Sequence, residues 1–139
     1  MSHSQASGQF DVTLRPEPLS AVAETSGMNR MSLDKSYHGD LAAVSKGEML
    51  AFRSAIDGSA GYVAMETVTG TLRGRAGAFV LQHSATMIRG TPAQSIVVVP
   101  DSGTGDLSGL SGSLKITITE GQHAYTFEYM LPESAENAS

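Results

Sequence analysis

The segment from Pro100 to Ile118, PDSGTGDLSGLSGSLKITI, constrains the fold of this chain more than any other. Four glycines between residues 103 and 112 interrupt a stretch of small residues that leads into a run of β-branched ones. Each interior glycine costs a helix about 0.5–1 kcal/mol relative to alanine, so no helix is expected here. Glycines at this spacing favour turns, bulges and close backbone approach in a curved sheet. The segment therefore predicts an all-β fold.

The composition predicts one domain in a reducing compartment. A chain of 139 residues with 40% apolar residues can build one hydrophobic core, to which seven methionines add adaptable volume. Cysteine is absent, which excludes disulfides, thiolate metal ligands and a cysteine nucleophile. We therefore expect a cytoplasmic protein.

The charge and hydropathy patterns limit the partners of the protein. The net charge is −5 and the nine basic residues are scattered, so no nucleic-acid binding is expected. No window approaches the ~18 apolar residues of a membrane span. The first residues, MSHSQASG, lack a basic region followed by an apolar one, so we expect neither a signal peptide nor a membrane partner.

Alternating apolar and polar residues predict eight strands. The third of them, residues 40–56, has a composition that also suits a helix, and Asp40 could cap it. Gly47 in its middle and the strands around it favour a strand, with a helix as the alternative. The predicted strands cover residues 9–14, 30–38, 40–56, 62–72, 78–88, 95–99, 113–119 and 124–131.

Short connections between these strands predict an antiparallel up-and-down arrangement. Eight such strands can form a closed or nearly closed, calycin-like barrel, which leaves no exposed edge; an open sandwich is the rival architecture. The barrel would cover residues 9–131, with disordered tails at residues 1–8 and 132–139. An eight-stranded barrel is wide enough inside for side chains or for one small ligand.

Several motifs resemble those of known barrels. GTGDLSGLSGSLKI followed by HAYTFEYML is similar to the C-terminal signature of allene oxide cyclase-like barrels, and dirigent proteins share a version of its turn. SYHGDL (residues 36–41), residues 58–87 and VVPDSGTGDLSGLSG (residues 98–112) resemble a bacterial family of uncharacterised proteins, with a domain of unknown function, that has this barrel. The resemblance implies a small, often oligomeric barrel with an end-on cavity for a small apolar molecule. It carries over no catalytic residue of the cyclases.

His83 is the leading candidate for a functional residue. Alternation places it on the apolar, inward face of its strand, and a buried imidazole needs a hydrogen-bond partner. Tyr129 on the last strand, which shares an inward face with Tyr125 and Phe127, could supply one. The functional interpretation is a cavity base or ligand contact; the structural alternative is a core histidine.

Two glutamates extend this hypothesis. Glu66 and Glu128 have outward parity and are expected in solvent, but a bulge that turned either inward would give an acid/base pair with His83. Lys35 falls on the apolar face of its strand and is expected near solvent. The catalytic candidates are thus His83, Glu66 and Glu128. The ligand-binding candidates are His83, Tyr129, Tyr37, Phe127, Met87 and Gln82.

Other features predict partners and exclude cofactors. The outer face of Val80, Gln82 and Ile88 is half apolar, which predicts a homo-oligomer, with a dimer favoured. His38-Gly39-Asp40 is typical of a turn, and Gly103-Thr104-Gly105 lacks the remainder of a nucleotide-binding motif. We expect no metal and no cofactor. No G-x-S-x-G motif is present, which disfavours a serine hydrolase.

These observations leave three hypotheses about function. The first is a barrel that binds a small apolar or aromatic molecule in its cavity. The second is an isomerase or cyclase that acts on such a molecule in the same cavity. The third is a structural or interaction module whose barrel is filled. The sequence alone decides neither whether the protein is an enzyme nor which ligand it takes, because fold does not give function.

Overall fold

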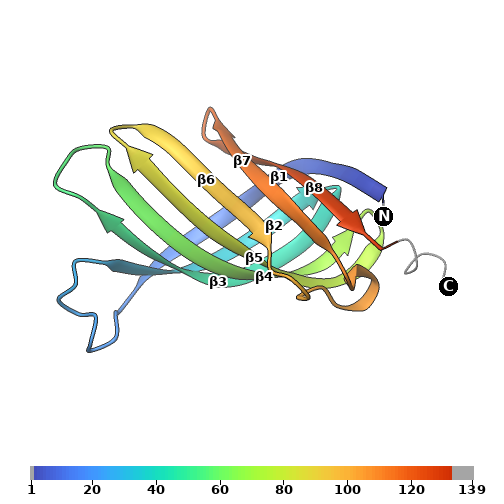
Figure 1. Ribbon diagram of the computed structural model, residues 1–139, viewed down its shortest axis with the longest axis horizontal. Helices are drawn as coiled ribbons and strands as arrows, with labels where there is room; N and C mark the ends of the chain where they lie inside the picture. The colour runs from blue at the N-terminus through green and yellow to red at the C-terminus, as the bar shows by residue number, and fades with distance from the viewer. Residues whose placement is uncertain (1, 133–139) are drawn as a thin grey trace.

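The computed structural model describes residues 2–132, in which eight strands close into one antiparallel barrel (Figure 1). Each strand pairs with the next, and β8 pairs back onto β1, which confirms the predicted all-β up-and-down barrel and excludes the sandwich. A short 3-10 turn, η1, is the one helical element in this range. The elements are β1 Ser2–Glu17, β2 Asn29–Gly39, β3 Leu41–Arg53, β4 Ala60–Leu72, β5 Arg75–Ile88, β6 Thr91–Val98, η1 Gly105–Leu107, β7 Ser111–Thr119 and β8 Gln122–Leu131.

The segment with helix-like composition is the strand β3, so the helix alternative is wrong. Gly47 shows why a strand wins here. Its backbone packs so closely on β4 that an added Cβ would lie 2.0 Å from the Met65 carbonyl oxygen and 2.8 Å from Glu66 Cα. Pairing with β2 and β4 on both sides outweighs the weak helix propensity of the side chains.

The predicted disordered tail at residues 1–8 is wrong for residues 2–8, which form the first half of β1. β1 is long enough to pair with β8 through its first half and with β2 through its second, and Ala6 points into the core. These residues carry almost no apolar alternation, but backbone pairing across the closing seam needs none. Of the predicted C-terminal tail, residues 133–139 lie outside the described residues.

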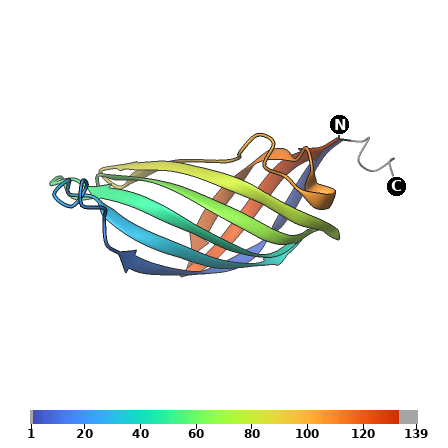
Figure 2. The same cartoon turned by 90° about the horizontal axis from the view of Figure 1, so that it is seen from below.

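One end of the barrel is filled by a core. Phe79 and Phe127 stack with ring centroids 5.7 Å apart, and Phe127 stacks on Tyr129 at 5.2 Å. The glycine-rich connection between β6 and β7 folds back over this end, beside the N-terminus (Figure 2), and buries Leu107 and Leu110 against the core. This arrangement plugs one end and leaves the other end hollow.

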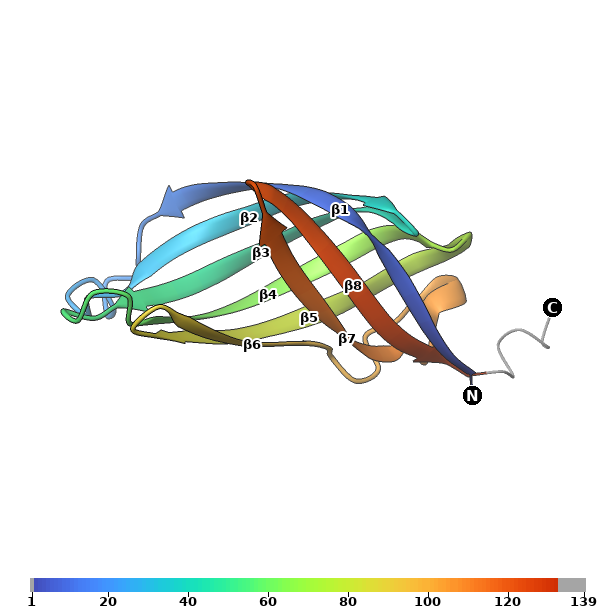
Figure 3. The ribbon, with the colours of Figure 1, turned by 90° about the horizontal axis from the view of Figure 1, so that it is seen from above.

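The barrel is weakly closed between β6 and β7. Their register contains a single pair, Val97 with Ser113. Towards the hollow end the β7–β8 hairpin diverges from β6 (Figures 1 and 3). A side chain replaces part of the missing ladder there, because Gln94 Oε1 accepts a hydrogen bond of 2.8 Å from the Ile116 amide. This seam is therefore the least-bonded part of the wall in the described chain.

We predict that Gly47→Ala destabilises the protein, because the new Cβ would overlap the Met65 carbonyl group. An overpacked site of this kind costs about 1–3 kcal/mol, measured as the free energy of urea unfolding. Gly61→Ala on β4 is the matched control, since its Cβ would meet no atom closer than 3.6 Å. A Gly47→Ala protein as stable as Gly61→Ala would contradict the close packing of β3 on β4.

We also predict that Gln94→Leu opens the β6–β7 seam locally. The Ile116 amide loses its acceptor, so its hydrogen exchange accelerates, and the exchange of paired amides on β4 stays unchanged. Native-state exchange followed by NMR measures both. Unchanged protection of Ile116 in the variant would contradict the role given to the Gln94 side chain.

Candidate functional site

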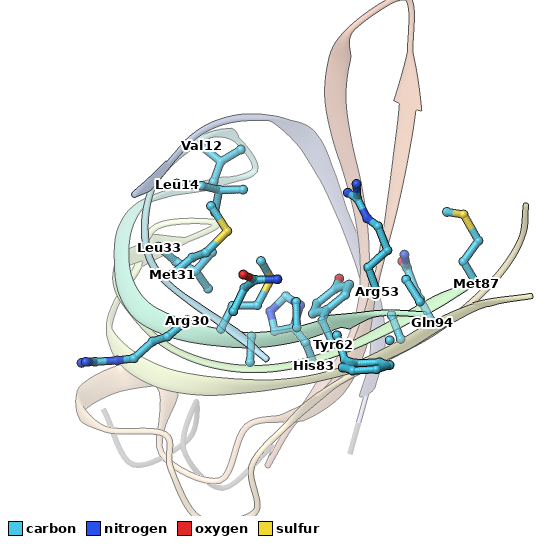
Figure 4. A pocket seen from close by; sticks show the side chains of 18 of the residues that line it. Val12, Leu14, Arg30, Met31, Leu33, Arg53, Tyr62, His83, Met87 and Gln94 are labelled. Atoms are coloured by element: carbon cyan, nitrogen blue, oxygen red, sulfur yellow. The ribbon is translucent and has the colours of Figure 1, made fainter. Parts of the chain in front are cut away.

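The hollow end of the barrel contains a cavity of about 980 Å³. This volume is at the upper end of the roughly 300–1,000 Å³ usual for small-molecule sites. The close view in Figure 4 shows its curved wall, with Val12, Leu14 and Leu33 on one side and His83 and Tyr62 on another. Side chains from both edges of the open seam, Gln94 among them, also line the cavity. The lining is mainly apolar and includes Leu14, Met31, Leu33, Met49, Phe52, Ala64, Ala85, Met87, Ile116 and Ile118.

Four buried polar side chains form a charged cluster at the inner end of this cavity: Lys35, Tyr37, Glu66 and His83. Glu66 Oε2 accepts hydrogen bonds from Lys35 Nζ at 2.8 Å and from His83 Nε2 at 2.7 Å. The Tyr37 hydroxyl donates to Glu66 Oε1 at 2.5 Å. Glu66 is 1% exposed, His83 3% and Lys35 5%, and the last two line the cavity. The cluster is therefore enclosed by protein on one side and faces the cavity on the other.

The register of the β4–β5 hairpin brings Glu66 and His83 together. A two-residue turn, Arg73-Gly74, pairs Leu72 with Arg75, and this register places Ala64 opposite His83. Glu66 is then the inward diagonal neighbour of His83. Both residues of the turn have positive φ, as the tight hairpin turns that match strand twist require.

Small residues on β3 let β2 reach the carboxylate. Lys35 and Tyr37 point inward from β2, and β3 separates them from Glu66 on β4. At this level the inner face of β3 carries Ser45 and Gly47, which leave room for the two longer side chains to cross it. The Ser45 hydroxyl is buried and makes no hydrogen bond within residues 2–132.

The cluster keeps Glu66 ionised. Burial raises the pKa of this carboxyl, but the hydrogen bond from His83, the charge of Lys35 and the bond from Tyr37 outweigh burial and lower the pKa to about 2. Burial, followed by the nearby Glu66 charge, raises the pKa of the Tyr37 hydroxyl, which stays protonated. Because an ionised carboxylate only accepts hydrogen bonds, Nε2 of His83 carries a proton, and the neutral form of the imidazole then has its lone pair on Nδ1.

Lys35 also contacts aromatic rings. Its Nζ lies 4.9 Å from the centroid of the Phe10 ring and 5.8 Å from that of Tyr37. Such contacts stabilise an ammonium by about 0.5–2 kcal/mol. Glu66 is the one carboxylate that bonds Lys35 in the described part of the chain. With His83 neutral, the ammonium and the carboxylate cancel, and the cluster carries no net charge.

The three predicted catalytic residues do not lie together in the structure, because two of them face the inside of the barrel and one faces outward. His83 faces inward, as expected. The outward prediction for Glu66 is wrong, and no bulge is involved: the regular inward face of β4 carries Ala64, Glu66 and Val68. Glu128 does point outward, where its carboxylate lies 3.7 Å from His3 Nε2, far from the cluster.

The predicted ligand-binding residues divide into three groups. Tyr37 belongs to the charged cluster, and Met87 lines the outer part of the cavity. Tyr129 and Phe127 lie in the filled end, do not line the cavity and make no bond with His83. Gln82 is exposed on the outer face of β5. The interpretation of Tyr129 as the partner of His83 is therefore wrong, and Glu66 takes that place.

Sequence reasoning missed Lys35 as part of the site. Lys35 was expected near solvent, whereas its ammonium is inside the barrel on Glu66. Two inward basic side chains, Lys35 and His83, need a buried acidic partner. With that requirement, the hairpin turn would have identified Glu66, since pairing Leu72 with Arg75 puts Glu66 opposite the inward Leu81. Tyr62 also lines the cavity, and no pattern in the sequence would have identified it as part of the site.

Two further observations concern ions and membranes. Nowhere in residues 2–132 do three or more histidine, aspartate or glutamate side chains gather in a group that could hold a metal ion. Over the same residues, no helix has the length and apolar character needed to cross a membrane.

Comparison with known proteins gives the chain close relatives. The family model described as "Protein of unknown function (DUF3224)" matches residues 6–129. The chain is 44% identical in sequence to a protein with unknown function from the DUF3224 family, from Shewanella oneidensis. The crystal structure of that protein matches this one with a TM-score of 0.87. The match covers 94% of this chain and 99% of that one. No curated protein matches the chain.

We predict that the charged cluster makes the free energy of unfolding depend on pH in the acidic range. The Glu66 carboxyl has a pKa of about 2 in the folded protein against an ordinary value of 4.5. A carboxyl with a depressed folded pKa stabilises the fold above the ordinary value, and this stability disappears as the pH falls from about 5 towards about 2. The full effect is up to about 3 kcal/mol.

Urea unfolding at several pH values measures this effect. Glu66→Gln removes it, so the free energy of unfolding should fall less between about pH 5 and about pH 3 than in the unmodified protein. If Glu66→Gln alone unfolds the protein because the Lys35 ammonium is left unpaired, the double variant Lys35→Met with Glu66→Gln is measured instead. Glu128→Gln on the surface is the control. The same acid dependence with and without Glu66 would contradict the assignment.

Proposed function

The chain belongs to the DUF3224 family of proteins of unknown function, and we propose from its own site that it binds a small, mostly apolar molecule with one neutral polar group. The observation that carries the proposal is the position of Lys35 and His83 at the inner end of an otherwise apolar cavity of about 980 Å³. Concave, mainly apolar sites with a few convergent polar groups are typical of ligand pockets.

The distribution of side-chain size supports a ligand rather than a filled barrel. The inner positions of the hollow end carry small residues, among them Ala51, Ala64 and Ala85, whereas the filled end carries Phe79 and Phe127. A barrel that served only as a scaffold would gain stability from larger side chains at the alanine positions, because burial of each methylene group contributes about 0.8 kcal/mol. The hollow end forgoes that stabilisation, which favours the binding hypothesis over the structural one.

The charge of the cluster selects the polar group of the ligand. Lys35 and Glu66 cancel, so a carboxylate ligand would bring an unbalanced negative charge into an apolar cavity. A carbonyl or hydroxyl oxygen can accept a hydrogen bond from Lys35 without adding charge. We therefore place a ketone or alcohol oxygen at the cluster and the hydrocarbon body against Leu14, Met31 and Leu33.

Three predictions from the sequence remain part of this proposal. The homodimer is supported by apolar side chains on the outer face of β4 and β6, where Val63, Met65 and Val97 are exposed. The cytoplasmic location and the likeness to allene oxide cyclases stay predictions.

We predict that nonan-2-one and nonan-2-ol raise the melting temperature of the protein more than nonanoate at the same concentration, at about pH 8. A ligand that binds only the folded state stabilises it by about 2.7 kcal/mol at a hundredfold excess over Kd. Differential scanning fluorimetry measures the shift. A larger shift with nonanoate would contradict the neutral head group.

Two substitutions locate the binding. Ala85→Phe places a ring in the cavity and should abolish the shifts. Ser84→Phe adds the same ring to the exposed face of β5 and should keep them. If neither compound stabilises the protein, or if both variants respond alike, the cavity is not the ligand site.

A further inference from the structure

We propose that the charged cluster transfers protons: His83 Nδ1 removes a proton from the carbon next to a ketone carbonyl, and Lys35 stabilises the enolate oxygen. The substrate class is an enolisable ketone with an apolar body. This inference deepens the proposed function and rests on it, because the ketone must first bind in the cavity.

The first observation concerns the orientation of His83. Its Nε2 is held at 2.7 Å by Glu66, and Nδ1 has no hydrogen-bond partner among the described residues. Nδ1 is also not fully buried. Within residues 2–132, the one side-chain nitrogen or oxygen that is both buried and without a hydrogen-bond partner is the Ser45 hydroxyl oxygen. With His83 in the lining, its lone pair is therefore open to the cavity. A carboxylate that holds one imidazole nitrogen and leaves the other free as a base is a recurring catalytic arrangement.

The second observation concerns Lys35. Its ammonium has three N–H donors, and one bond, to Glu66, is formed with a described residue. Lys35 Nζ and His83 Nε2 bond the same carboxylate oxygen, so the two side chains converge on one part of the cavity. A ketone oxygen on Lys35 therefore has its neighbouring C–H bond close to the imidazole. A donor already in place for the developing oxyanion is often the largest catalytic contribution.

The reaction balances within the site. His83 Nδ1 takes the proton, the C–H electron pair forms the C=C bond of the enolate, and the carbonyl π pair moves onto the oxygen. The imidazolium then returns the proton to the same carbon or, in an unsaturated ketone, to the far end of the conjugated system. When the imidazolium N–H exchanges with solvent before the proton is returned, the first course places a solvent hydrogen on that carbon, whereas the second course moves a double bond. Neither needs an oxidant, reductant or further reactant.

The charges that develop match the charges already present. The imidazolium forms against the Glu66 carboxylate, and the enolate oxygen forms against the Lys35 ammonium. The site begins neutral with a neutral ketone and stays neutral overall, so no net charge is created in the apolar cavity.

The location of the cluster argues against a purely structural role. Tyrosines aside, the buried charged or polar side chains of the described chain, Lys35, Ser45, Glu66 and His83, lie at this one level of the barrel. Apolar residues of similar volume are often as stabilising as a buried ion pair. The buried residues of the filled end, a few residues along the same strands, are aliphatic or aromatic, and none of those described is a lysine, histidine or carboxylate. Within residues 2–132, the buried lysine, glutamate and histidine side chains are found only where the barrel meets the cavity.

Deuterium exchange tests the proposal. Nonan-2-one is incubated with the protein in D₂O at about pD 8, and mass spectrometry follows deuterium uptake at the carbons beside the carbonyl. We expect His83→Asn to lower the exchange rate by about a hundredfold, the usual contribution of a general base. His38→Asn is the matched control, because the His38 ring is exposed on the outer face of β2, bonds Asp11 there and does not line the cavity. It should exchange at the unmodified rate.

Two further measurements keep the test independent of folding. Nonan-2-ol has the same chain and cannot enolise, so it should suppress the exchange by competition in the unmodified protein. NMR of ¹⁵N-labelled histidine should show the Nε2–H form of His83 in the unmodified protein and a changed tautomer population in Glu66→Gln. Glu66 acts here as a positioning residue, so the exchange rate of the ketone should fall in Glu66→Gln together with the Nε2–H population, whereas a merely structural role would leave the exchange rate unchanged.

The outcomes separate this inference from the proposed function. Exchange that follows His83 and is suppressed by nonan-2-ol supports proton transfer. If the ketone stabilises the protein but exchanges at the same rate with His83→Asn, the cavity binds ketones and the proton-transfer proposal is overturned. If the ketone does not bind at all, the proposed function fails and this inference fails with it.

Discussion

The Glu66 carboxylate is the interaction on which the rest of this barrel depends. It lies on β4 and accepts hydrogen bonds from Lys35 and Tyr37 on β2 and from His83 on β5. The bonds from Lys35 and Tyr37 cross β3, so one side chain links three strands, β2, β4 and β5, from the inside. The crossing is possible because β3 offers only Ser45 and Gly47 at this level. The closest approach of β3 to β4 and the ionic contacts are therefore parts of the same arrangement.

Alternation in the sequence was enough to predict the barrel and the inward direction of His83, because strand periodicity depends only on local residues. It could not place Glu66, since the faces of two strands are aligned by the register between them, and register here follows from the two-residue turn at Arg73-Gly74. Residues 2–8 were not predicted as a strand because their pairing partner lies far away in the sequence. Their pairing with β8 is made by backbone groups more than a hundred residues away in the chain, which no local pattern records.

Side-chain size along the strands divides the barrel into two functional halves. Aromatic residues on β5 and β8 and the folded-back glycine-rich connection fill one end and give it a rigid core. Alanines occupy inner positions of the other end, and the wall there is interrupted where β7 leaves β6 and the Gln94 side chain bridges the gap. The closed end thus holds the fold, while the hollow end has space and the least-bonded seam. Both properties support the binding site that we propose.

The charged cluster lies at the boundary between these halves, and its position explains its composition. Deeper in the core, an ion pair would only add the cost of removing two charges from water. Farther out, in the mouth of the cavity, solvent would screen it and release the imidazole from a fixed orientation. At the boundary the protein holds Glu66 ionised from one side, while Lys35 and His83 keep a donor and a lone pair for the cavity on the other. A group of charges that is balanced within itself, yet unsaturated towards an apolar space, supports our proposal of a neutral ligand whose own charge separates only during reaction.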